Sequence, residues 1–180
     1  LASMIWKDPQ KSFSDPVLAD KYLTAAKQIY DFGKKHQATQ PGNPFYNETS
    51  WRDDMALAAI ELYRATHTAA YLNDARSFGK SAQNGWTMDW SEMHSLAHYE
   101  IGRTDPSYRS TAIQFLKRDI DSYQSKAKQN PFRAALESFY WGSAAVMVGQ
   151  ALEMLWYEDL SGDHSYHNLA QQQRDYVLGG

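Results

Sequence analysis

The chain has 180 residues, with 18 Lys or Arg against 21 Asp or Glu, and its formal net charge is −3 at neutral pH. This balance excludes the strongly basic surface that nucleic-acid binding requires, and it offers no polybasic membrane anchor. Cysteine is absent, so the sequence predicts no disulfide and no thiolate metal site. No cofactor is expected either.

The first 82 residues predict an outer and an inner layer of helices. Asp15 followed by Pro16 is typical of a helix start, and apolar residues on one face continue to about Gly33. The loop over 37–49 is longer than an ordinary connection, which favours a place at a functional site. The next helix, from residue 50 to about 66, is apolar over most of its girth and should be buried. The helix over about 69–82 has a narrower apolar face and should lie outside it.

The same alternation recurs in the rest of the chain. We expect a helix over 89–101, a new outer helix from Asp105-Pro106, a broadly apolar helix over about 143–156, and an amphipathic helix over 164–178. No segment has a convincing strand pattern. The longest apolar stretch, from Gly142 to Leu152, is too short to cross a bilayer, so no membrane partner is expected.

Three turns that join a buried helix to an outer one resemble one another. Each ends in a tyrosine, Tyr71, Tyr108 or Tyr166, and these tyrosines are unequally spaced. A helical solenoid would repeat at a fixed period. Helix pairs with uneven spacing and long loops at one end therefore predict an all-α fold of the α/α toroid type.

Two blocks of the sequence are similar to glycoside hydrolase family 9, the cellulase and endoglucanase family. The first block contains FYN at 45–47, WRDDM at 51–55, ELYRAT at 61–66 and AYL at 70–72. The second contains FYWGS at 139–143, LSGD at 160–163, Tyr166 and DYVLG at 175–179. The resemblance implies a partial (α/α)6 catalytic domain over residues 1–180, a cellulose-type β-1,4-glucan as the partner, cleavage with inversion, and an extracellular location.

The chain also departs from the family pattern. The Asp-Ala-Gly-Asp motif of the catalytic base and the His-His-Arg substrate motif, which precedes the general acid Glu, are both missing. The resemblance therefore assigns no catalytic residue to this chain, only cleft wall, and implies that the 180 residues alone are inactive. The start at Leu1-Ala2-Ser3 fits a segment of a longer protein. The alternatives are a family 9 glucosaminidase-type enzyme and a non-catalytic helical scaffold that binds protein.

The acidic pairs are weak candidates for catalysis. An inverting glycosidase needs two carboxyls about 6.5–9.5 Å apart. Asp53 and Asp54 are adjacent on a helix and point about 100° apart, and a first-turn position favours a capping role. We expect the remaining pairs to be solvated or capping: Asp119 with Asp121, and Asp159 with Asp163.

His94 and His98 have the i, i+4 spacing of two metal ligands on one helix. The glutamate of a zinc protease does not lie between them, and no third ligand is evident. Packing or hydrogen bonding is the favoured interpretation, and no metal site is predicted.

Aromatic residues are the better candidates for substrate binding. Trp, Tyr and Phe make up 14% of the chain, and pyranose rings present C–H faces that stack on aromatic planes. Tyr46, Trp51, Trp86 and Trp141 lie in or beside loops that precede inner helices. By resemblance, Tyr46, Trp86 and Trp141 fall where the family places sugar-stacking aromatics, although Trp90 could replace Trp86. Ordinary packing remains the alternative for each of them.

A partial toroid should also leave apolar helix faces uncovered. We expect such faces around Leu57, Ala58, Val146 and Val148. Exposed apolar patches of more than a few hundred Å² usually recruit a partner or cause aggregation. The chain is therefore expected to associate with other segments or with copies of itself.

Overall fold

The computed structural model describes residues 1–11, 14–38, 50–82, 87–88 and 92–179. All regular secondary structure in these residues is helical, as the sequence predicted. The helices are α1 (Ala2–Lys7), α2 (Pro16–Lys35), α3 (Arg52–Thr66), α4 (Ala69–Ser81), α5 (His94–Thr104), α6 (Arg109–Gln129), α7 (Ser143–Ser161) and α8 (His167–Leu178).

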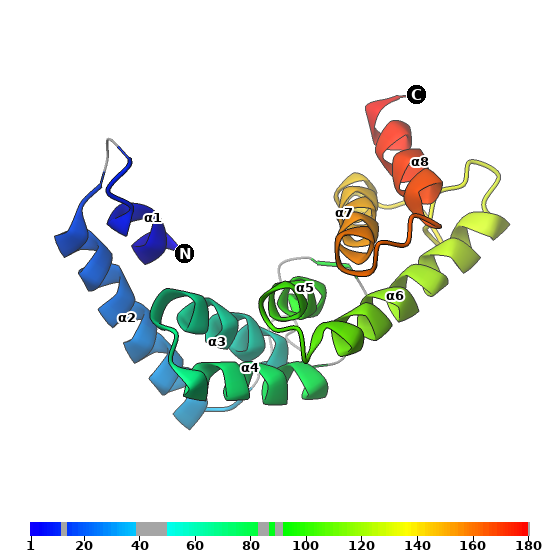
Figure 1. The fold of residues 1–180 in the computed structure, drawn as a ribbon. Helices are drawn as coiled ribbons and strands as arrows, with labels where there is room; N and C mark the ends of the chain where they lie inside the picture. The colour runs from blue at the N-terminus through cyan, green and yellow to red at the C-terminus, as the bar shows by residue number, and fades with distance from the viewer. Residues whose placement is uncertain (12–13, 39–49, 83–86, 89–91, 180) are drawn as a thin grey trace.

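The helices follow one another along an open arc, and the two termini lie at its two ends (Figure 1). Three hairpins make up most of this arc: α3 packs on α4, α5 on α6, and α7 on α8. The first helices of these hairpins also contact one another, α3 with α5 and α5 with α7. They form the inner row, with α4, α6 and α8 outside, which confirms the predicted alternation.

The inner helices α3 and α5 run in the same direction. At the start of α3, Asp53 accepts a hydrogen bond from the backbone N–H of Met93, just before α5 (2.8 Å). Near the other end of α3, Arg64 pairs with Glu100 in α5 (2.8 Å). The N-terminal ends of these two helices therefore lie side by side, on the same side of the inner row.

Small side chains allow the helices of the core to approach closely. Ala56, Ala59 and Ala97 are fully buried in the inner row, where they pack with Ile60 and Ile101. Within the described residues, no helix combines the length and the apolar character needed to cross a bilayer.

Three predicted helix starts differ from the structure. The outer helix α6 begins at Arg109 and not at Asp105-Pro106. The carboxylate of Asp105 accepts a hydrogen bond from the N–H of Ser107 (3.0 Å) and pairs with Arg76, so it closes a turn before the helix. Similarly, α8 begins at His167 and not at His164. Of the helix expected over 89–101, residues 89–91 lie outside the described residues, and α5 begins at His94.

Of the residues expected on uncovered apolar helix faces, Val148 is exposed as predicted, and the prediction for Val146 is wrong. Val148 is 48% exposed, whereas Val146 is buried in a small cluster with Ala134, Leu136 and Met147. The connection before α7 folds back and covers Val146. Leu57 and Ala58 are half-buried and pack against the main core.

The close contact of α5 with α6 gives a stability prediction. A Cβ atom added at Gly102 would lie 2.7 Å from the Cβ of Ala112, which cannot move without its backbone. At Gly33 the nearest atom is the sulfur of Met55 at 3.0 Å, at the end of a flexible side chain. We expect Gly102→Ala to lower the free energy of unfolding by about 1–3 kcal/mol through overpacking. Gly33→Ala should be neutral or stabilising because alanine favours the helix. Chemical denaturation of both variants tests this, and equal effects would contradict it.

Candidate functional site

Trp141 lies at an exposed corner immediately before the inner helix α7. The N–H of Ser143 donates to the carbonyl of Tyr140 (3.1 Å), and the N–H of Tyr140 donates to the hydroxyl of Ser143 (2.7 Å). These two bonds close a tight turn with Trp141 at its tip. The indole is 87% exposed, so most of its surface is available for a ligand.

The turn belongs to the connection between α6 and α7. Two buried glutamines from α7 and α8 hold this connection. The side chain of Gln173 in α8 accepts from the N–H of Ala135 (2.8 Å) and donates to the carbonyl of Arg133 (2.9 Å). Gln150 in α7 donates to the carbonyl of Ala135 (2.9 Å). Both glutamines are fully buried, where an amide is stable only if it is hydrogen-bonded. They fix the backbone at Arg133 and Ala135, in the connection that leads to Trp141.

Two neighbours of Trp141 are also exposed, although they were not among the residues predicted from sequence to bind sugar. Phe139 is 48% exposed and Tyr140 is 45% exposed. The ring of Phe139 stacks on Tyr176 of α8, with 5.6 Å between the ring centroids. We call residues 139–141 the aromatic rim. Three consecutive aromatic residues at 139–141 could have indicated an aromatic surface at this position.

The other aromatic candidates have different surroundings. Trp51 is half-buried, makes an edge contact with Phe78 (5.6 Å between centroids) and carries the guanidinium of Arg52 over its ring at 4.8 Å. Its contacts are those of a packing residue, and its role in sugar binding stays a prediction. Tyr46 and Trp86, as well as Trp90, lie outside the described residues.

The interior contains a group of acidic and histidine side chains between α5, α6 and α7. His94 lies 3.3 Å from the carboxylate of Asp119, and Tyr123 donates to the carboxylate of Glu153 (3.0 Å). Burial and the nearby charge of Asp119 raise the pKa of Glu153 well above its usual range. The expectation that Asp119 is solvated or capping is therefore wrong: it is 3% exposed.

The two histidines of the i, i+4 pair face different partners. Burial disfavours the charged form of His94, but Asp119, Glu92 and Asp53 together outweigh it, and its pKa lies above the usual value. His98 stacks on Phe115 and bonds the hydroxyl of Tyr108. Burial, with the neighbouring positive charges of His94 and Arg118, lowers the pKa of His98 to about 3. The two side chains are therefore both built into the core, through different partners.

Asp53 and Asp54 diverge as the helix geometry predicts. Asp53 is buried and holds the backbone before α5. Asp54 is exposed, and its pKa is raised to about 6 by partial desolvation and by the charges of Asp53 and Glu92. Asp53, Glu92 and His94 offer donor atoms within 4.8 Å of one another, so this end of the inner row has the residue types of a cation site.

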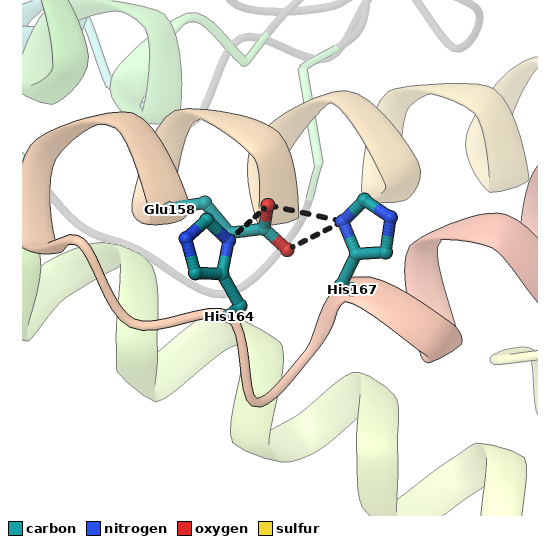
Figure 2. Close-up of side chains that lie close together, drawn as sticks. All are labelled: Glu158, His164 and His167. Atoms are coloured by element: carbon teal, nitrogen blue, oxygen red, sulfur yellow. Dashed lines mark hydrogen bonds and ion pairs between the residues drawn. The ribbon is translucent and has the colours of Figure 1, made fainter.

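A second group of potential metal ligands lies at the C-terminal end of α7. The carboxylate of Glu158 is 3.2 Å from Nδ1 of His164 and 3.1 Å from Nδ1 of His167 (Figure 2). Among the described residues, these are the two groups whose donor atoms lie close enough together to hold one metal ion.

The sequence and the helical architecture both match a known protein family. The family model described as Glycosyl hydrolase family 9 matches residues 1–180. The chain belongs to glycosyl hydrolase family 9. Endoglucanase A of Bacillus pumilus is 28% identical over 200 residues, which cover 98% of this chain and 29% of that protein. Endoglucanase D of Acetivibrio thermocellus is 24% identical, covering 92% of this chain and 29% of that protein.

Solved structures of family 9 share the fold. The cellulase Cel9M of C. cellulolyticum superposes with a TM-score of 0.80 at 31% identity, over 98% of this chain and 40% of that one. Its structure in complex with cellobiose gives a TM-score of 0.79. These family 9 structures are (α/α)6 toroids, and the present chain covers part of one. It spans less than a third of the length of the curated relatives it matches most fully.

Proposed function

We propose that this chain is a segment of an inverting β-1,4-glucan hydrolase, to which it supplies cleft wall and aromatic sugar subsites but not the catalytic acids. The subsite residues are Tyr46, Trp86 and Trp141, with Trp51 as a further candidate. The matched relatives are endoglucanases and cellulases, and one of the solved structures holds cellobiose. Because cellulose is too large to enter a cell, we propose an extracellular location.

The exposure of Trp141 is the observation that carries the subsite proposal. An indole that is 87% exposed loses most of the free energy that burial would give it. A tight turn closed between Tyr140 and Ser143 holds it there. Two buried glutamines anchor the earlier part of the same connection. A rigid aromatic plane at the end of an inner helix is suited to stack on the C–H face of a glucose ring.

The catalytic acids are proposed to come from other segments of the protein. Asp53 and Asp119 are buried and bonded within the core. Asp121 pairs with Lys117, and Asp163 accepts from Tyr157 and from the backbone of Ser165. These contacts serve the structure and leave the carboxylates poorly placed for a shared substrate bond.

The rest of the same protein is proposed to cover an apolar groove between α2 and α3. The groove has a volume of about 550 Å³ and is lined by residues such as Tyr22, Ile29, Met55 and Ala58. Ile29 is 72% exposed. A face of this kind is stable in water only when another surface covers it. Further helices of the toroid are the natural cover, because the matched relatives are more than three times as long.

Hydrolysis assays on two proteins test the proposed function. The full-length protein should release reducing sugar from cello-oligosaccharides, whereas residues 1–180 alone should release none. Appreciable turnover by the purified 180-residue chain would contradict the placement of the catalytic acids. Chito-oligosaccharides serve as the second substrate, and faster cleavage of these would favour the glucosaminidase-type alternative.

A further inference from the structure

The turn between α7 and α8 brings three potential metal ligands together. Glu158 lies in the last turn of α7, His164 in the connection, and His167 at the first position of α8. Nδ1 of His164 lies 3.2 Å from one carboxylate oxygen, and Nδ1 of His167 lies 3.1 and 3.2 Å from both (Figure 2). Both rings therefore direct the same nitrogen to one carboxylate.

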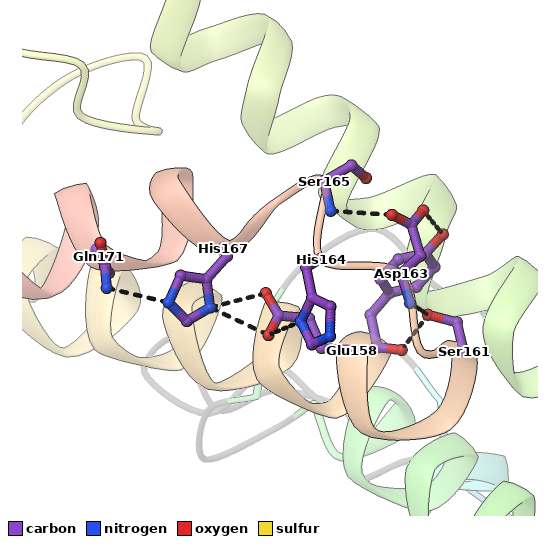
Figure 3. A network of polar contacts seen from close by, with 8 residues as sticks. Glu158, Ser161, Asp163, His164, Ser165, His167 and Gln171 are labelled. Atoms are coloured by element: carbon purple, nitrogen blue, oxygen red, sulfur yellow. Dashed lines mark hydrogen bonds and ion pairs between the residues drawn. The ribbon is translucent and has the colours of Figure 1, made fainter.

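The path of the connection explains this convergence. Gly162 takes a positive φ of 73°, which ends α7 and reverses the chain so that His164 returns over the helix. The hydroxyl of Ser161 accepts from the N–H of Asp163 (3.0 Å), and Asp163 accepts from the N–H of Ser165 (2.9 Å) and the hydroxyl of Tyr157 (2.9 Å) (Figure 3). These bonds hold the loop, so the ligands need little reorganisation.

The spacing of the donor atoms matches a tetrahedral zinc site. Ligands at about 2.0–2.2 Å in a tetrahedron lie roughly 3.3–3.5 Å from one another. The two nitrogen-to-oxygen separations of 3.1 and 3.2 Å are close to this, and all three donor atoms lie within 4.8 Å of one another. Two histidines and one glutamate form a known class of zinc ligand set, in which water takes the fourth position. We propose that Glu158, His164 and His167 form a Zn²⁺ site that joins the end of α7 to the start of α8.

Burial and exposure suit this site. The side chain of Glu158 is 9% exposed, whereas His164 is 74% and His167 is 45% exposed. The carboxylate is thus fixed against the protein, and the imidazoles face solvent, from which an ion and a water can enter. Imidazole ligands select zinc and its transition-metal neighbours over Ca²⁺ or Mg²⁺, which prefer oxygen.

Gln171 is placed to orient one of the ligands. Its amide nitrogen lies 3.0 Å from Nε2 of His167, one turn along α8 (Figure 3). When Nδ1 binds a metal, the neutral ring carries its proton on Nε2 and needs an acceptor there. A half-turn of the amide supplies its oxygen at the same place. Gln171 therefore serves as a positioning residue for His167.

The site is remote from the aromatic rim. Glu158 lies fifteen positions after Ser143 in the same helix, which is roughly 22 Å at 1.5 Å per residue. The ion is therefore a structural clamp on the α7–α8 hairpin and takes no part in sugar binding. Since this hairpin also holds Gln173 and the connection before α7, the clamp supports that connection indirectly.

Titration calorimetry with ZnCl₂ on the tag-free full-length protein tests this proposal. His164→Ala changes the most exposed ligand in a loop, so the fold should survive, and Glu158→Gln removes the charge at nearly constant shape. Each should weaken Zn²⁺ binding by more than roughly 100-fold, because even a residue that only orients a ligand is worth 10–100-fold. His36→Ala is the matched control, an exposed histidine near the end of α2, and should leave binding unchanged. Circular dichroism checks the fold of each variant.

Co²⁺ gives a second, spectroscopic readout. Bound at this site it should show the intense visible absorption of tetrahedral coordination, which His164→Ala removes and His36→Ala does not. Zn²⁺ should also raise the melting temperature of the wild type but not of His164→Ala. Zn²⁺ binding that is equally strong in wild type and in folded His164→Ala and Glu158→Gln, or absent from the wild type, would overturn the proposal.

Discussion

Replacing Trp141 by alanine is expected to weaken cello-oligosaccharide binding to the full-length protein by roughly 2- to 13-fold, the range that aromatic contacts of about 0.5–1.5 kcal/mol give. The indole is 87% exposed, so its removal leaves no cavity and should change the free energy of unfolding very little. The loss should therefore appear in binding and hydrolysis while stability stays constant.

Tryptophan fluorescence during a cello-oligosaccharide titration measures this effect, together with hydrolysis rates on the same ligands. Trp141→Phe keeps an aromatic plane and should retain part of the affinity. Phe132→Ala is the matched control, because Phe132 is a 69% exposed aromatic in the same connection between α6 and α7 but lies outside the FYW sequence. If Trp141→Ala bound and cleaved the oligosaccharide as well as the wild type, Trp141 would have no stacking role.

The order and layering of the helices could be predicted from sequence because they follow from local periodicity. A helix apolar around its girth, such as α3 with its buried Ala56, Ala59 and Ile60, must lie among others. Helix starts were less predictable. The side chain of Asp105 bonds Ser107 and Arg76 instead of the first turn of α6, and Arg76 lies 29 residues earlier.

The charged interior could not be predicted for a similar reason. Asp119 looked like one of several surface acids, but His94 comes to it from another helix. The ligands Glu158, His164 and His167 span a helix end, and they meet only because Gly162 reverses the chain. No fixed sequence spacing predicts that three such residues will lie close together. For Trp51, the sequence could not show that Phe78 packs against it, whereas the exposure of Trp141 follows from its turn.

Replacing Glu153 should separate the effect of its charge from that of its hydrogen bond. Glu153 is fully buried in α7 and accepts from the hydroxyl of Tyr123 (3.0 Å). Burial and the charge of Asp119 raise its pKa, so the folded protein retains a proton that the unfolded chain releases near pH 4.3. The stabilisation from this proton is complete at acid pH and is lost as the pH rises through the raised folded-state pKa.

Glu153→Gln keeps a neutral side chain of the same shape at every pH. We therefore expect the wild type to lose stability relative to this variant as the pH rises from about 4.3, where the unfolded chain releases the proton, to the raised folded-state pKa of Glu153. Below and above this window the difference between the two should stay constant. Glu153→Leu removes the carboxylate that accepts a hydrogen bond from Tyr123. The buried hydroxyl of Tyr123 then loses this hydrogen bond. This variant should lower the free energy of unfolding by about 1–3 kcal/mol.

Denaturant unfolding of the full-length protein between pH 4 and pH 9 measures both effects. Glu137→Gln is the matched control, since Glu137 is 81% exposed and makes a long ion pair with Lys126 (3.6 Å). An exposed pair of this kind contributes at most about 1 kcal/mol. A pH profile that is parallel for wild type and Glu153→Gln would mean that Glu153 is not held protonated. In that case the carboxylate would be stabilised by a group other than Tyr123, and His94, which already contacts Asp119, would be the next residue to replace.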